Sequence, residues 1–229
     1  DVLRALEKDE KTRTACQTCE LCEPEGDRID IAIHLFGSDL SKVLVVEGRS
    51  DAGIAILEKL GLKEEPLPPG REGKVRILVE KRRERNMKLM EDVGKSSFGL
   101  ENLSDTLSKC ISCHNCMTVC PICYCKECFF ESPTFEYDAE KYLRWAERKG
   151  SIRMPVATFL FHIGRMNHMA VSCVGCGMCE QACPSKLPLL SMFKAVGAEL
   201  QKVFEYQPGR KLDEPLPLVV YREEELEPE

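Results

Sequence analysis

Residues 109–130 read KCISCHNCMTVCPICYCKECFF, and seven of these positions are cysteine. The first four cysteines have the spacing C-x2-C-x2-C-x3-C, and a proline follows; the run is Cys110, Cys113, Cys116, Cys120 and Pro121. The same spacing recurs further along the chain, in Cys173, Cys176, Cys179, Cys183 and Pro184. A run of this kind binds a 4Fe-4S cluster in bacterial ferredoxins. The sequence therefore predicts two 4Fe-4S clusters.

The fourth cysteine of each run is predicted to bind the cluster of the other run. Three thiolates at two-residue gaps let a tight loop surround one corner of a cubane, whereas the fourth lies where the chain leads away. One predicted ligand set is Cys110, Cys113, Cys116 and Cys183. The other predicted set is Cys173, Cys176, Cys179 and Cys120. Gly175 and Gly177 are expected to let the backbone approach the inorganic sulfides closely.

Six cysteines lie outside the two runs, namely Cys16, Cys19, Cys22, Cys123, Cys125 and Cys128. The first three begin like another cluster run, but Gly26 stands where the fourth cysteine would be. A third 4Fe-4S cluster would therefore combine ligands from both groups. The preferred set is Cys16, Cys19, Cys125 and Cys128, with Cys22 and Cys123 as alternates. A zinc ion, or buried thiols without a metal, are the alternatives.

Composition argues against several classes of protein. The chain has 229 residues, 43% of them hydrophobic, which is enough for one sizeable domain or two small ones. The net charge of -6 gives no basic patch for nucleic acid or an anionic membrane surface. The apolar stretches are far shorter than the roughly 20 residues needed to cross a bilayer. No secretory signal is visible, and the cysteines are bunched rather than spread as in disulfide scaffolds, so we expect a reducing, anaerobic cytoplasm.

The residue pattern divides the chain into four predicted regions. They are a small α/β segment with the first cysteine motif (1–70), a charged connecting helix (71–100), a helical dicluster ferredoxin domain (101–210) and an acidic tail (211–229). The tail is expected to be disordered. The predicted fold class is α+β, with a mostly helical ferredoxin domain that carries two 4Fe-4S clusters and follows a small α/β segment.

Short-range patterns predict individual elements within these regions. Residues 1–11 have helical composition, and β-branched residues predict strands at 29–33 and 43–46. Ser50 or Asp51 is expected to cap the next helix at its start. Further helices are expected at 137–149 and 156–169. After the second run, one apolar stripe is expected to face the core, and it consists of Leu189, Phe193, Val196, Leu200 and Val203.

The two cysteine runs are separated by 52 residues, from Pro121 to Ser172, most of them helix-forming. A compact two-cluster ferredoxin has a short linker at this point. The long insert resembles the helical ferredoxin domain of fumarate reductase iron–sulfur subunits and of the small heterodisulfide reductase subunit. In that fold, helices rather than a β-hairpin hold the clusters.

Longer segments carry a more specific resemblance. They are CPICYCKECFFESPTF at 120–135 and LFHIGRMNHMAVSCVGCGMCEQACPSKLPL at 160–189. Both resemble the carboxy-terminal half of the formate dehydrogenase beta-subunit family. That family is related to the deazaflavin-dependent hydrogenase and dehydrogenase beta subunits, and is often found with heterodisulfide reductase-like flavoproteins. The resemblance extends upstream to the motif Cys16-x-x-Cys19 and to Asp30-Ile31-Ala32-Ile33.

This resemblance implies an iron–sulfur electron-transfer subunit of a multi-subunit anaerobic oxidoreductase. The partners that it implies are a flavoprotein, a molybdenum or tungsten formate dehydrogenase-like catalytic subunit, or a heterodisulfide reductase-like subunit. Relatives that act on a deazaflavin carry a flavin-binding region ahead of the Cys16-type motif. Because fifteen residues precede Cys16 here, flavin binding and deazaflavin reduction are not expected of this chain.

No residue is predicted to be catalytic. The chain has neither G-x-G-x-x-G nor G-x-x-x-x-G-K-[ST], so nucleotide binding through those loops has no support. His162 and His168 are expected to be packed or hydrogen-bonded, and His114 either donates to a cluster sulfur or faces solvent. Two functions remain. The first is a relay of single electrons between partner subunits, which is favoured because eight ligands accompany no substrate motif. The alternative is a flavin-dependent oxidoreductase subunit that acts directly on a deazaflavin or another small substrate.

Overall fold

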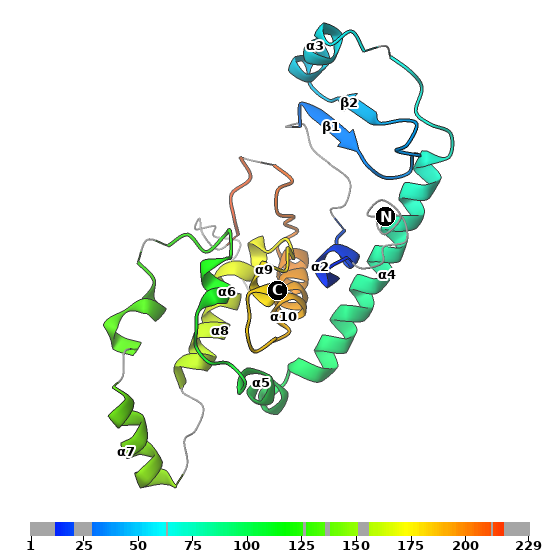
Figure 1. Ribbon diagram of the computed structural model, residues 1–229. Coiled ribbons are helices and arrows are strands. Elements are labelled where there is room, and N and C mark those ends of the chain that lie inside the picture. The colour runs from blue at the N-terminus through cyan, green and yellow to red at the C-terminus, as the bar shows by residue number, and fades with distance from the viewer. Residues whose placement is uncertain are drawn as a thin grey trace. The chain divides into compact units, whose positions relative to one another are not determined.

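The computed structural model describes residues 12–20, 29–62, 64–125, 127–135, 138–150, 156–211 and 213–217 (Figure 1). These residues fall into two compact units. The first comprises the described residues of Asp1–Leu89 and Arg210–Leu212, and the second those of Met90–Gly209 and Asp213–Glu229. The boundary lies within the long helix α4, Arg71–Ser97. The predicted helix over residues 1–11 and most of the predicted acidic tail lie outside the described residues.

The first unit contains a small antiparallel sheet with one helix beside it (Figure 1). Strand β1 (Ile31–His34) pairs with β2 (Val45–Gly48) so that Ile31 lies opposite Gly48 and His34 opposite Val45. Helix α3 (Asp51–Lys59) follows and contacts β2. Each strand ends one or two residues later than the sequence predicted. The small α/β character of this segment is confirmed.

Ser50 is the N-cap of helix α3, one of the two caps that the sequence predicted. Its hydroxyl oxygen accepts a hydrogen bond from the Gly53 amide at 3.1 Å, which satisfies one of the free donors of the first turn. The same hydroxyl donates to the Asp30 carboxylate at the start of the sheet. One side chain therefore joins the helix start to the β1 edge.

Replacing Gly53 with alanine is expected to loosen the contact between α3 and the sheet. A Cβ atom at this position would overlap the carbonyl oxygen of Asp30, and backbone cannot move aside as a flexible side chain can. Overpacking of this kind costs about 1–3 kcal/mol. Hydrogen–deuterium exchange of the β1 and β2 amides should become faster.

Gly73 is the matched control for that substitution. It lies in the first turns of α4, and a Cβ atom there meets nothing within 4 Å. Because alanine favours a helix over glycine, Gly73→Ala should leave the exchange of the sheet amides unchanged or slower. Equal effects of the two alanine variants would contradict the packing argument.

The second unit is built from helices, and the strands among the described residues all belong to the first unit. Its elements are α5 (Leu100–Leu107), α6 (Asn115–Thr118), η1 (Phe129–Glu131), η2 (Pro133–Phe135), α7 (Ala139–Lys149), α8 (Val156–Met169), η3 (Ala170–Ser172), α9 (Met178–Gln181) and α10 (Leu189–Val203). Helices α6, α8, α9 and α10 gather together (Figure 1). The predicted α+β class, with a mostly helical cysteine-rich domain, is confirmed.

Two buried apolar clusters form the core of the second unit. The larger cluster consists of Val93, Leu107, Met166, Met169, Met192 and Phe193. The other consists of Cys116, Met117, Phe161, Leu187 and Leu189, and run cysteines pack against its edge. The core therefore directly supports both cysteine runs. None of the described helices has the length and apolar character needed to span a bilayer.

The expected core stripe on α10 is correct for its first half only. Leu189 and Phe193 are buried, but Val203 is 71% exposed. In the last turn of α10, Gln201 rather than Val203 contacts the neighbouring backbone. Its amide donates to the carbonyl oxygens of Val171 and Cys173 at 3.0 and 3.2 Å. Because Val203 lies two residues beyond Gln201, it points to the other side of the helix.

Candidate metal centre

The two cysteine runs fold into loops with the same backbone path. Two residues after the first cysteine of each run, Ser112 and Gly175 have φ angles of 54° and 64°. Two residues further on, His114 and Gly177 have φ angles of 55° and 73°. All four residues lie in the left-handed region, where glycine meets no steric penalty. The first run adopts this strained path with serine and histidine, so the path itself is required.

Each loop directs one backbone amide at its own first sulfur. The amide of Ser112 donates to Cys110 Sγ, and that of Gly175 donates to Cys173 Sγ, both at 3.4 Å. A one-turn helix follows each loop, α6 in the first run and α9 in the second. An N–H···S bond stabilises the charged thiolate form of cysteine. The local sequence therefore builds the same thiolate cradle twice.

A recess in the second unit is lined by four cysteines. Three of them, Cys110, Cys113 and Cys116, come from the first run, and the fourth is Cys183, the last cysteine of the second run. The recess holds about 300 Å³ of atom-free space, including the part open to solvent. We call it the four-cysteine recess. The structure thus brings the last cysteine of one run to the first three of the other.

The other cysteines of the two runs also lie near one another. Burial raises the pKa of the Cys179 thiol to about 12, and the charges of Cys173 and Cys120 act in the same direction. Burial likewise raises the pKa of Cys173, with smaller contributions from Cys176 and Cys120. Cys120, from the first run, is therefore close to cysteines of the second run.

The chemistry of the recess fits a 4Fe-4S cluster. Four sulfur donors surround one space, which is the donor set that such clusters use. Burial raises the pKa of Cys110 and Cys116, so these thiols need a bound cation to release their protons at neutral pH. Among the described residues, no three histidine, cysteine or acidic side chains are arranged to hold a single metal ion. A four-iron cluster has a different requirement, because each thiolate binds its own iron.

Two histidines adjoin the four-cysteine recess. His162 is 1% exposed, and its Nε2 lies 3.3 Å from Cys110 Sγ. Burial lowers the pKa of His162 to about 4, with help from the charges of Arg165 and His114. The ring of His114 stacks on Phe161 at a centroid distance of 4.3 Å. The predicted packed or hydrogen-bonded role of His162 is confirmed.

Arg165 is a feature that the sequence reasoning missed. It is 3% exposed, and its Nη2 donates to the carbonyl oxygen of Cys116 at 3.1 Å. Its Cζ lies 5.6 Å from the ring centre of Phe161 and 5.0 Å from that of Phe193. The available signal was its position four residues after Phe161, which puts both side chains on the same buried face of α8.

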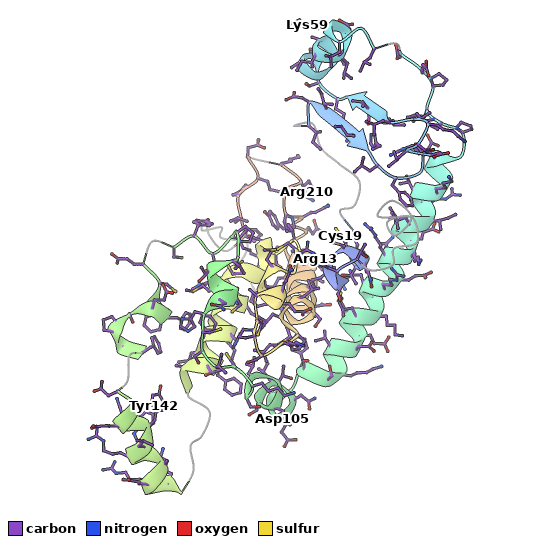
Figure 2. The ribbon with its side chains drawn as sticks, viewed as in Figure 1. Arg13, Cys19, Lys59, Asp105, Tyr142 and Arg210 are labelled. Carbon is purple, nitrogen blue, oxygen red and sulfur yellow. The ribbon has the colours of Figure 1, made fainter. Side chains whose placement is uncertain are left out.

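The remaining cysteines are divided between the two units. In the first unit, the amide of Cys19 donates to the carbonyl oxygen of Cys16 at 3.3 Å, next to the one-turn helix α2 (Thr14–Gln17). Figure 2 labels Arg13 and Cys19 at the two ends of this helix. Arg13 Nη2 lies 3.9 Å from Cys16 Sγ. Cys22 lies outside the described residues.

The second unit contains the other half of the predicted third set. Burial is the largest influence on the pKa of Cys123 and raises it, and the charges of Cys120, Cys125 and Cys128 add to that effect. Cys125 is exposed. The thiol of Cys128 lies 3.6 Å from Met117 Sδ. The preferred set of Cys16, Cys19, Cys125 and Cys128 therefore takes two members from each unit.

Comparisons with known proteins identify the cysteine-rich region. Residues 104–187 match the family described as the 4Fe-4S dicluster domain. The chain is 29% identical over 219 residues to the F420-dependent formate dehydrogenase subunit beta of Methanocaldococcus jannaschii, a match that covers 92% of this chain and 52% of that protein. It is 30% identical over 208 residues to the F420-dependent formate dehydrogenase 1 subunit beta of Methanococcus maripaludis, covering 86% and 49%.

The chain spans about half the length of the curated relatives that it matches. The matched domain contains every cysteine of the two runs, from Cys110 to Cys183. The predicted resemblance and the prediction of two 4Fe-4S clusters are confirmed by these matches. The chain therefore carries a 4Fe-4S dicluster domain at residues 104–187 and is similar, over most of its own length, to part of the beta subunits of F420-dependent formate dehydrogenases.

Proposed function

We propose that this chain relays single electrons between partner subunits of a multi-subunit oxidoreductase. A 4Fe-4S cluster supplies one-electron transfer when it is bound. The observation that carries the proposal is the four-cysteine recess, in which Cys183 of the second run completes the three cysteines of the first. A complete set of four thiolates leaves no open iron for a substrate. The chain's own residues therefore favour a carrier over a catalyst.

The ligand assignment is part of this proposal. Cys110, Cys113, Cys116 and Cys183 hold one cluster, and Cys173, Cys176, Cys179 and Cys120 hold the other. The lining of the recess supports the first set. The effect of Cys120 on the pKa values of Cys173 and Cys179 supports the second, because charges act strongly only at short range.

Exposure of the second cysteine in each run supports a relay. Cys113 and Cys176 are exposed, whereas Cys116 is buried and Cys179 is half-buried. Each cluster would therefore have one edge near the surface, where a partner's redox centre can approach. The two curated relatives are named as beta subunits of formate dehydrogenases. The proposed partners are a molybdenum or tungsten formate dehydrogenase-like catalytic subunit, a flavoprotein or a heterodisulfide reductase-like subunit, in the cytoplasm.

A third 4Fe-4S cluster remains part of the proposal. Its preferred ligands are Cys16, Cys19, Cys125 and Cys128, with Cys22 and Cys123 as alternates. The hydrogen bond from the Cys19 amide to the Cys16 carbonyl oxygen, and the effect of Cys125 and Cys128 on the pKa of Cys123, which burial chiefly raises, support thiols close together within each group. A zinc ion at the same ligands is the competing occupant, since thiolates at short spacing also suit zinc.

Metal analysis of the anaerobically purified chain tests the proposal. Two clusters should give about eight iron and eight sulfide per chain, and a third raises both to about twelve. The double variant Cys16→Ala, Cys19→Ala should lower twelve to about eight if the third cluster exists, and should leave eight unchanged if it does not. One or two zinc ions per chain without sulfide would contradict the whole assignment.

A second candidate is a subunit that acts directly on a deazaflavin or another small redox substrate through a flavin. The observation in its favour is the dependence on F420 in the names of both relatives. Flavin analysis of the purified chain, with a substrate-reduction assay, separates the candidates. The relay requires clusters that are reduced and reoxidised without bound flavin, whereas the alternative requires flavin and turnover by the isolated chain.

A further inference from the structure

Arg165 is a buried cation with unused hydrogen-bonding capacity. Its side chain is 3% exposed on α8, between the rings of Phe161 and Phe193. Nη2 donates to the Cys116 carbonyl oxygen, but Nε and Nη1 are buried without a hydrogen-bond partner. No acidic side chain among the described residues forms an ion pair with it. A buried cation with free donors is strongly unfavourable unless an anion lies beside it.

The side chains around Arg165 indicate where an anion would bind next to it. Phe161, whose ring the guanidinium contacts, belongs to a buried cluster with Cys116, and Cys179 packs against that cluster. Phe193, the second ring beside the guanidinium, belongs to the cluster against which Cys173 packs. Cys116 belongs to the first ligand set and Cys179 to the second. The guanidinium is therefore close to both sets. A 4Fe-4S cluster with four thiolate ligands is an anion, and the protein supplies this cation next to two of them.

We propose that Arg165 is a counter-charge shared by the two clusters, with its unpaired N–H groups directed at cluster sulfur and its positive charge raising both reduction potentials. The inference rests on the ligand sets of the proposed function. Reduction adds one electron from a partner or a chemical reductant to each cluster, and no bond forms or breaks. The added negative charge is stabilised by a fixed cation in a poorly solvated site, so reduction becomes easier. Arg165 is in this sense a positioning and tuning residue.

Two neighbouring side chains supply matched controls, because each contacts the loop of one ligand set. His162 contacts the sulfur of Cys110, which belongs to the first set. Lys194 packs against Gly175 in the loop of the second set, since a Cβ atom at Gly175 would meet the carbons of the Lys194 side chain. Replacing the His162 ring should therefore change the reduction potential of the first cluster, and removing the Lys194 charge should change that of the second. Removing Arg165 should change both.

The test is a potentiometric titration of the full-length chain, followed by electron paramagnetic resonance. Arg165→Met should move both midpoint potentials to more negative values. At a fixed poise, we expect the ratio of reduced to oxidised cluster to fall about tenfold for each, which is 59 mV for a one-electron couple. Arg165→Lys should move both less, because the charge is retained. His162→Gln should move only the first cluster, and Lys194→Met only the second.

Iron and sulfide content accompany each titration. Unchanged potentials in a fully loaded Arg165→Met protein, or a shift of one cluster alone, would overturn the inference. If Arg165→Met does not assemble clusters, Arg165→Gln replaces it. Assembly by Arg165→Lys with failure of both neutral variants supports the counter-charge, and failure of all three assigns a purely structural role and overturns it. An unsubstituted chain without about eight iron would instead contradict the proposed function.

Discussion

Replacing Cys183 with alanine is expected to remove the cluster of the Cys110–Cys116 loop and to leave the other cluster in place. Cys183 belongs by sequence to the second run, but its side chain lines the recess formed by the first. Without Cys183 the cluster keeps three thiolate ligands, and the recess has no other described cysteine to replace the fourth. The iron content should fall by about four per chain.

The identity of the lost cluster is the decisive measurement. Electron paramagnetic resonance spectra of reduced Cys183→Ala should match those of Cys110→Ala, in which the first loop itself is damaged. Spectra of Cys120→Ala should match those of Cys173→Ala. The reverse pairing, with Cys183→Ala resembling Cys173→Ala, would mean that each run binds its own cluster, and would contradict crossed ligation.

Replacing Leu107 with alanine is expected to lower the free energy of unfolding of the second unit by about 2–5 kcal/mol. Leu107 is 0% exposed and packs among Val93, Met166 and Met192. Its carbonyl oxygen also accepts a hydrogen bond from the Cys110 amide at 2.9 Å. The lost side chain leaves a cavity where the first cysteine loop begins. Anaerobic urea unfolding, followed by circular dichroism and by the visible absorbance of the clusters, measures the loss.

Ile111 provides the control for Leu107, since it follows Cys110 directly but is 66% exposed. Ile111→Ala removes a side chain of the same size and should change the free energy of unfolding by no more than about 0.5 kcal/mol. Similar losses for the two variants would show that the loop, and not the core beneath it, dominates stability. We expect Leu107→Ala to release its clusters at a lower urea concentration.

Local patterns in the sequence predicted most of the helices. The predicted helix at 156–169 is α8, and the cap at Ser50 begins α3. These features depend on neighbours within about four residues, which sequence reasoning can assess. The same reasoning placed the whole stripe of α10 in the core. It was wrong at Val203, because Gln201 on another side of the helix bonds the backbone of η3 and the following cysteine.

Features of the candidate site that depend on distant residues were not predictable in the same way. His162 meets Cys110 across 52 positions of sequence, and Arg165 meets the Cys116 carbonyl across 49. The sequence of α8 alone does not reveal the hydrogen-bond partners of a histidine and an arginine among apolar residues. Their roles follow only once the helix packs against both cysteine loops.

The sequence by itself determined the ligand chemistry of this protein. Cysteine spacing set two tight loops, and the positive φ angles at Gly175 and Gly177, repeated at Ser112 and His114, show that the spacing imposes one local path on different side chains. The tertiary structure decided which cysteine of one run lies beside the loop of the other run. It also decided which buried charged side chain lies next to the loops. The physical reason is that bonds within a loop are local, whereas Cys183 and Arg165 reach the first loop through the buried cluster in which Cys116 packs with Phe161 of α8.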